Sequence, residues 1–250
     1  MKRKYRKSPI IEAVCEFRFD DEKEWDLTAP GLIYNQIKRE FPNKRQKQQY
    51  DLQIGRPKDE IAHKIEKSGI TQFVSNDENN LIQLGEHFIT INTFSPYNGW
   101  DNYLPKIDIG LQSYFEIINP TKIKRIGLRY INKLPFEKST VELKDYFQFY
   151  PNVGDSSIDN YSSFITGIQL PHENSIGTRD ITKVMLNSLE EKKQEGLIAL
   201  LDIDHFTNIG IEIDISKIKE WLNSSHSRVI EIFEACIKDS LREKFELIKE

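Results

Sequence analysis

The stretch Lys122-Ile-Lys-Arg-Ile-Gly-Leu-Arg-Tyr-Ile-Asn-Lys-Leu134, at the middle of the chain, decides the fold. Successive side chains of a β-strand point to opposite faces of a sheet, so this pattern predicts a central strand with two different faces. One face is typical of a core and carries Ile126, Leu128, Tyr130, Asn132 and Leu134. The other face is polar and carries Arg125, Gly127, Arg129 and Ile131. The glycine between the two guanidinium groups leaves room for another group to approach.

The segments around this strand predict further strands that pair in antiparallel fashion. Ile10–Phe19 alternates apolar and polar residues, as a half-buried strand does. Three later runs, Ser163–Leu170, Asp180–Leu189 and Leu197–His205, follow one another with short connections, which is typical of an antiparallel meander. A helical pattern beginning at Trp100 separates the early strands from the central one.

The last helix has the clearest pattern in the chain. Ser224 or Ser225 is its predicted N-cap, and apolar residues recur at steps of three, one and four from Val229 to Ile248. This predicts one apolar stripe over about five turns. Exposing such a stripe costs about 25 cal/mol per Å² of apolar surface, so it must lie against a sheet or a partner.

Together these elements predict an α+β fold, with antiparallel sheet packed on long amphipathic helices, in a single domain over residues 1–250. The order of strand, tryptophan, helix and Phe-Glu pair occurs in Leu81–Glu116 and again in Leu197–Glu234. This echo suggests two similar β-then-α halves, about 1–134 and 135–250, with chance similarity as the alternative.

Composition indicates a soluble globular protein, with 38% hydrophobic and 30% charged residues. No apolar run reaches the roughly 18–20 residues of a membrane span, and no apolar segment follows the basic N-terminus as in a signal peptide. Cys15 and Cys236 occupy apolar positions and are expected to be reduced and buried, which fits the cytoplasm. Residues 1–67 hold 16 Lys/Arg against 12 Asp/Glu, a basic end that fits either a nucleic-acid contact or a solvated surface.

Three segments are similar to a known family when taken together. They are Pro9-Ile-Ile-Glu-Ala-Val-Cys-Glu-Phe-Arg-Phe19, Arg125-Ile-Gly-Leu-Arg-Tyr-Ile-Asn132, and the helix segment in which four residues separate Trp221 from His226. They resemble a sporadically distributed prokaryotic family of uncharacterised proteins of about this length. The resemblance brings no chemistry, and it implies an accessory, defence or toxin–antitoxin role.

The polar face of the central strand is the main candidate site. If the first strand lies beside it, Glu12, Glu16 and Arg18 share a surface with Arg125 and Arg129. Two or three guanidinium groups there suit an anionic ligand such as a phosphate or a carboxylate. The alternative is a structural ladder of salt bridges between strands.

Two further candidates involve groups that catalysts use. Asp202 and Asp204 lie on one face of a predicted strand, with His205 on the other, and paired carboxylates bind divalent cations or transfer protons. His226 is predicted to lie in the first turn of the last helix beside two serines, without a third catalytic group. A solvated strand end and a capping turn are the respective structural alternatives.

The sequence therefore predicts a cytoplasmic binding or adaptor protein that recognises a protein partner or a small anionic ligand through its polar sheet face. It contains no recognisable cofactor, zinc or phosphate-loop motif, and binding is favoured over catalysis. Two alternatives stay open: a metal-dependent hydrolase or nuclease-like effector using Asp202 and Asp204, and nucleic-acid binding through the basic N-terminal third. Whether the chain forms a homo-oligomer is also left open.

Overall fold

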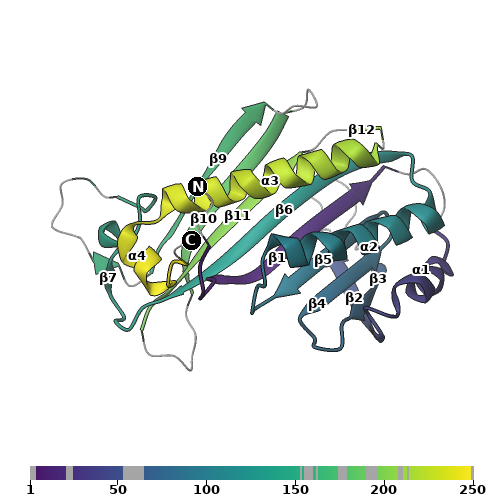
Figure 1. The fold of residues 1–250 in the computed structure, drawn as a ribbon, viewed down its shortest axis with the longest axis horizontal. Coiled ribbons are helices and arrows are strands. Elements are labelled where there is room, and N and C mark those ends of the chain that lie inside the picture. The colour runs from purple at the N-terminus through teal and green to yellow at the C-terminus, as the bar shows by residue number, and fades with distance from the viewer. Residues whose placement is uncertain are drawn as a thin grey trace, which may run out of the picture.

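A computed structural model of the chain describes residues 4–20, 25–52, 65–152, 154, 160–161, 163–173, 179–189, 196–207, 211–212 and 214–248. It shows an α+β fold with one large antiparallel sheet and helices packed on one of its faces, as predicted (Figure 1). The helices are α1 (Ala29–Ile37), α2 (Trp100–Ile118), α3 (Ile215–Cys236) and α4 (Asp239–Lys244). The strands of the large sheet are β1 (Ile10–Phe19), β2 (Asn43–Leu52), β3 (Ile65–Val74), β4 (Asn80–Gly85), β5 (Phe88–Phe94), β6 (Lys122–Pro135), β9 (Ile165–Glu173), β10 (Arg179–Leu189), β11 (Ile198–Thr207) and β12 (Ile211–Glu212).

The strand order of the sheet is β2-β3-β4-β5-β1-β6-β11-β10-β9, and β12 pairs with one end of β6. β1 pairs with β5, the last strand of the meander β2–β5 that follows β1 in the sequence. In the same way, β6 pairs with β11, the last strand of the meander β9–β11 that follows β6. The two arrangements meet at the antiparallel pair β1–β6. This order groups β6 with the strands after it. A small second sheet joins β7 (Val141–Glu142) to β8 (Asn160–Tyr161), and a short 3₁₀ turn, Leu143–Asp145, follows β7.

The alternation of β6 confirms the two predicted faces. The core-side residues of β6, from Ile126 to Leu134, are at most 2% exposed, whereas Arg125 and Arg129 point to the other side. Burying such apolar side chains is the main source of stability, at about 25 cal/mol per Å² of apolar surface. We call the side covered by α2 and α3 the inner face and the opposite side the outer face.

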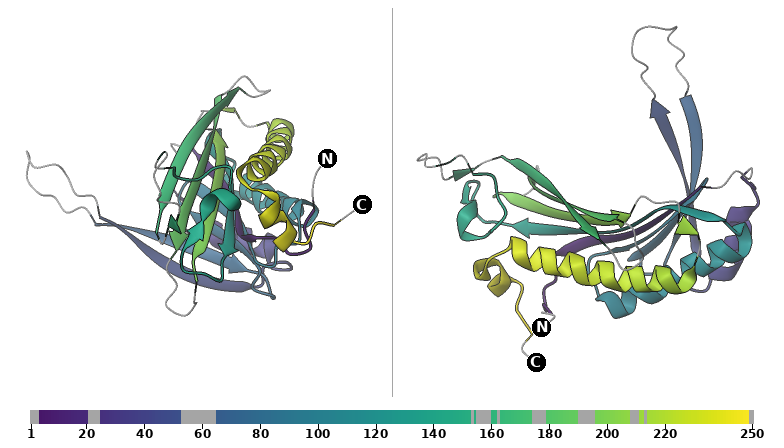
Figure 2. Two further views of the ribbon diagram at one scale, coloured as in Figure 1. Left: turned by 90° about the vertical axis from the view of Figure 1, so that its left-hand side faces the viewer. Right: turned by 90° about the horizontal axis from the view of Figure 1, so that it is seen from above.

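The helices α2 and α3 lie side by side across the inner face (Figures 1 and 2). α2 buries one stripe that includes Tyr103, Ile107, Leu111 and Tyr114. Gly110 lets this helix approach the sheet, because a Cβ atom there would lie 3.0 Å from the Ile91 side chain. α3 contacts β6 and β11, so the two helices cover neighbouring parts of one sheet.

The predicted start of the last helix is wrong. α3 begins at Ile215, and its N-cap is Asp214, whose side chain accepts hydrogen bonds from the N–H groups of Ser216 and Lys217. The apolar stripe extends back to Ile218, Trp221 and Leu222, all of them buried, so the helix continues through the predicted cap. His226 therefore lies in the middle of α3 and far from its N-terminal turn.

The predicted single stripe from Val229 to Ile248 is also interrupted. α3 ends at Cys236 because Ile237 is extended, with φ −112° and ψ 158°, and α4 starts only at Asp239. The segment around residues 146–148 forms hydrogen bonds with the backbone groups at this break. Gln148 N donates to Cys236 O at 2.8 Å, and Lys238 N donates to Tyr146 O at 2.8 Å.

The hairpin β2–β3 extends away from the rest of the sheet, on the side opposite the helices (Figure 2). β2 is an edge strand, and its described cations include Lys44, Arg45 and Lys47. Arg45 forms an ion pair with Glu78. The basic residues of the N-terminal third that fall in 1–3, 21–24 and 53–64 lie outside the described residues.

Candidate functional site

The outer face brings together residues that the sequence pattern placed in two separate candidates. β1 pairs with β6, which meets the condition set for the main candidate site, and β6 pairs with β11, so side chains of three adjacent strands share this surface. Its charged residues are Glu12, Glu16, Arg18, Arg125, Arg129, Lys133, Asp202 and Asp204. The four carboxylates are matched by three guanidinium groups and one ammonium group, which leaves no surplus of positive charge.

Arg125 is the centre of this surface and is held between two carboxylates. Its guanidinium contacts Glu16 on β1 and reaches Asp204 on β11, where Nη2 lies 3.0 Å from Oδ2. The group also lies over the Phe206 ring, 4.7 Å from its centroid. A Cβ atom at Gly127 would lie 2.4 Å from Arg125 Nη1, so the space beside the glycine is filled by the arginine itself.

The other charged groups of the outer face are paired as well. Arg129 donates from Nε and Nη2 to the two oxygens of Asp202, at 2.7 and 2.5 Å. This bidentate geometry is the strong form of the interaction. The remaining contacts join Arg18 Nη2 to Glu16 Oε2 at 3.0 Å and Asn92 Nδ2 to Glu12 Oε1 at 2.6 Å. The geometry is that of an interstrand salt-bridge ladder.

Burial raises the pKa of Asp204 above its ordinary value, and the nearby Arg125 and Arg129 only partly oppose this. Desolvation disfavours the charged carboxylate more than the arginines favour it. Asp202 and Asp204 are both engaged by arginine, and among the described residues no group of three or more His, Cys, Asp or Glu side chains is placed to hold a metal ion.

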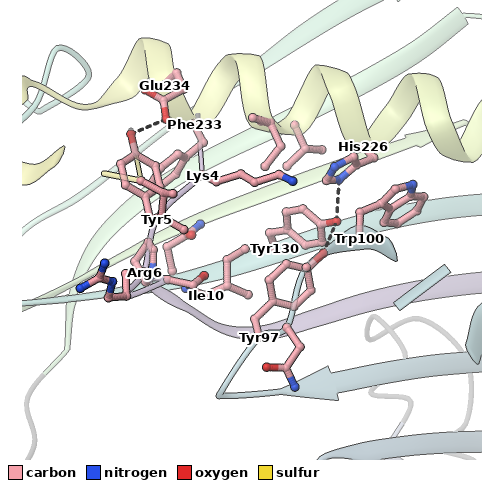
Figure 3. Close-up of a pocket in the computed structure, with 18 of the residues that line it drawn as sticks. Lys4, Tyr5, Arg6, Ile10, Tyr97, Trp100, Tyr130, His226, Phe233 and Glu234 are labelled. Carbon is pink, nitrogen blue, oxygen red and sulfur yellow. Dashed lines mark hydrogen bonds between the residues drawn. The ribbon is translucent and has the colours of Figure 1, made fainter. Parts of the chain in front are cut away.

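The inner face contains a cavity of about 620 Å³, the size that small-molecule sites commonly have (Figure 3). It lies between the N-terminal segment, the start of α2, the middle of β6 and the second half of α3. Its apolar lining includes Trp100, Val229, Ile230 and Phe233. Most of its polar groups come from the two chain ends and from a short chain of hydrogen-bonded side chains.

That chain joins Tyr97, Tyr130 and His226. The two tyrosine oxygens are 3.1 Å apart, and the Tyr130 oxygen lies 2.8 Å from His226 Nδ1. Trp100 stacks on the His226 ring with centroids 4.5 Å apart and an interplanar angle of 3°, which fixes the imidazole orientation. Burial raises the pKa of Tyr97 to about 12 and raises that of Tyr130, so both hydroxyls keep their protons at neutral pH.

The two ends of the chain form one wall of the cavity. Arg6 N donates to Glu246 O at 3.0 Å and Ile248 N donates to Lys4 O at 2.9 Å, so the two segments run together as an antiparallel bridge. Tyr5 closes the wall toward α3, because its hydroxyl donates to Glu234 Oε1 at 2.6 Å. Lys4 extends from this wall across the cavity toward His226 (Figure 3).

A second polar cluster lies under α3 and is closed to solvent. Asp180 Oδ2 accepts a hydrogen bond from Trp221 Nε1 at 3.1 Å and lies 3.3 Å from His205 Nε2. Thr182 Oγ1 lies 2.7 Å from His205 Nδ1. Acid, imidazole and hydroxyl occur in the order used in nucleophilic catalysis, but Thr182 is 0% and His205 3% exposed. The cluster therefore holds α3 against β10 and β11.

Sequence reasoning found His226 but missed its neighbours. Tyr130 and Asn132 lie on the predicted apolar face of the central strand, where a buried polar group needs a hydrogen-bond partner. Their polar character at core positions was the signal that could have pointed to this site. Tyr97 belonged to a predicted loop and Trp100 to a predicted helix start. Their meeting with His226 depends on contacts between distant segments.

A scan against protein-family models and a search of curated proteins gave no match to this chain. The resemblance to a sporadically distributed prokaryotic family therefore stays a prediction. Within the described ranges, none of the helices combines the length and apolar character needed to cross a bilayer.

Proposed function

We propose that this protein is a binding protein whose ligand occupies the cavity on the inner face. The observation that carries the proposal is the convergence of Tyr97, Tyr130 and His226 on a cavity of about 620 Å³ with apolar walls. Ligand sites are typically concave and mostly apolar, with a few well-placed polar groups that orient the ligand.

The outer face supports this assignment by contrast. Each of its arginines has a carboxylate partner, so a ligand there must compete with Glu16, Asp202 or Asp204. The predicted recognition through Arg125 and Arg129 therefore gains less support than recognition in the cavity. The hydrolase alternative has no specific geometric support, since Asp202 and Asp204 are both engaged by arginine.

The test uses N-phenyl-1-naphthylamine, a neutral apolar dye that fluoresces when it leaves water. We expect saturable binding at one site per chain. Ile230→Trp places a large side chain in the cavity and should abolish this binding. Ser227→Trp is the matched control, because Ser227 is an exposed residue of the same helix outside the cavity lining.

Thermal unfolding of both variants shows whether they fold. Binding that survives in a folded Ile230→Trp variant, or that is lost equally in both variants, would contradict a ligand in this cavity.

A further inference from the structure

We infer that the ligand of the inner cavity is an organic anion with an apolar, ring-bearing body. This inference rests on the proposed function and goes beyond it, because it names the charge of the ligand. The supporting features are a lysine that points into the cavity, donors that converge there, and apolar walls.

Lys4 supplies the positive charge. Its backbone is fixed by the bond from Ile248 N to Lys4 O, at 2.9 Å, and its side chain extends across the cavity toward His226 (Figure 3). Among the described residues, no carboxylate forms an ion pair with the Lys4 ammonium. An ammonium in such a position is suited to hold an anionic group of a ligand.

The start of α2 adds a second source of positive potential. The N-cap is Gly99, which has φ +90° and no side chain to cap the helix, and the first turn holds one carboxylate, that of Asp101. Unsatisfied N–H groups at a helix N-terminus favour anions. Gly99, Trp100 and Asp101 all line the cavity, so this end of the helix borders the space that Lys4 reaches.

The hydroxyl chain can also present a donor. The raised pKa values keep Tyr97 and Tyr130 protonated, and each hydroxyl has one hydrogen to donate. When His226 Nδ1 carries a hydrogen, it donates to Tyr130, Tyr130 donates to Tyr97, and Tyr97 is left to donate into the cavity. A hydrogen-bond acceptor on the ligand would favour this direction of donation along the three side chains.

The acidic residues of the lining weaken this positive character only partly. Glu234 accepts hydrogen bonds from Tyr5 at 2.6 Å and from Arg242 Nε at 2.8 Å, so its charge is balanced within the wall. Asp101 is exposed to solvent, as Lys4 and Arg6 are, so solvent weakens these three charges alike. Arg6 is a further cation of the lining.

The test compares two dyes that share one ring system. 1-Anilinonaphthalene-8-sulfonate is an anion, and N-phenyl-1-naphthylamine lacks the sulfonate. We expect the anionic dye to bind more tightly to the intact chain. Lys4→Met removes the charge but keeps an unbranched apolar side chain, and should weaken binding of the anionic dye about tenfold while leaving the neutral dye unchanged.

Lys7→Met is the matched control, because Lys7 belongs to the same segment but pairs with Glu246 outside the cavity lining. It should leave both affinities unchanged. Equal affinities for the two dyes, with no effect of Lys4→Met, would overturn the anion inference and keep the cavity as a binding site. Failure of both dyes to bind would remove the proposed function itself.

Discussion

The two faces of the sheet carry similar polar groups in different states of pairing. On the outer face, Arg125 and Arg129 are bound by carboxylates of the adjacent strands. On the inner face, Lys4 and the Tyr97–Tyr130–His226 chain surround a cavity. Paired charges between strands favour one register, because a one-residue slip moves each side chain to the other face. Hydrogen-bond donors around a cavity instead favour the binding of a ligand there.

The largest effect is expected from Arg125→Met, which leaves Glu16 and Asp204 without their shared cation. Both carboxylates are only about one-fifth exposed, at 18% and 22% for their side chains. Removing one partner of a mostly buried pair is strongly destabilising, and we expect the free energy of unfolding to fall by about 3 kcal/mol. Denaturant titration measures this loss.

The affinity for the anionic dye should not change in Arg125→Met. Arg18→Met is the control on the same face, since the Arg18 side chain is 58% exposed and its loss should matter little. Loss of dye binding with normal stability in Arg125→Met would reverse the roles assigned to the two faces.

Tyr130→Phe should affect both stability and binding, by a smaller amount. It removes the hydroxyl between Tyr97 and His226, and a hydrogen bond typically contributes about 0.5–1.5 kcal/mol to stability. Tyr103→Phe is the matched control, because Tyr103 is equally buried and donates to Ile91 O at 2.6 Å outside the inner cavity. Only Tyr130→Phe should weaken dye binding; equal dye affinity in the two variants would count against the hydroxyl chain.

Arg129→Met should cost less than Arg125→Met. The Arg129 side chain is 44% exposed and has Asp202 as its partner, so we expect a loss of about 1 kcal/mol in denaturant titration. A loss as large as that of Arg125→Met would show that the outer-face charges act as one cooperative network. A double variant then measures the coupling.

The smallest effect at neutral pH is expected from Asp204→Asn. The raised pKa of Asp204 means that the folded chain holds this proton more tightly than the unfolded chain. Its contribution to stability is therefore complete below the ordinary pKa and is lost as the pH rises through the raised pKa. At pH 7 the substitution should change the free energy of unfolding by no more than about 1 kcal/mol.

The pH dependence of stability distinguishes a carboxyl group whose pKa is raised by burial from one that mainly forms an attractive ion pair with Arg125. The stability of the intact chain relative to Asp204→Asn should be greater below pH 4 than at pH 7. The opposite trend would show that Arg125 attracts the carboxylate more strongly than burial disfavours it.

Local patterns were enough to predict the faces of β6 and β1, because the two-residue alternation of a strand needs no tertiary information. They did not reveal that Asp202 and Asp204 meet Arg129 and Arg125, since that depends on the register between β6 and β11. The local pattern of β2 predicts no strand over its whole length, because Asn43–Leu52 is mostly polar. Its strand conformation comes from pairing with β3.

The inner cavity was beyond local prediction for a different reason. It is lined by the two chain ends, the loop before α2, the middle of β6 and the second half of α3, which are far apart in the sequence. His226 was assigned to a helix start because Ser224 and Ser225 are good caps, whereas Asp214 caps the helix further upstream. The competition between two possible caps was decided by buried residues such as Trp221.

The most direct test follows side-chain N–H signals by nuclear magnetic resonance while 1-anilinonaphthalene-8-sulfonate is added. The chain has three tryptophans, Trp25, Trp100 and Trp221, and Trp100→Phe assigns the signal from the cavity. We predict that the Trp100 indole signal shifts in a saturable way while the Nε–H signals of Arg125 and Arg129 stay in place. Shifts of the two arginines with an unmoved Trp100 would place the ligand on the outer face and contradict the account.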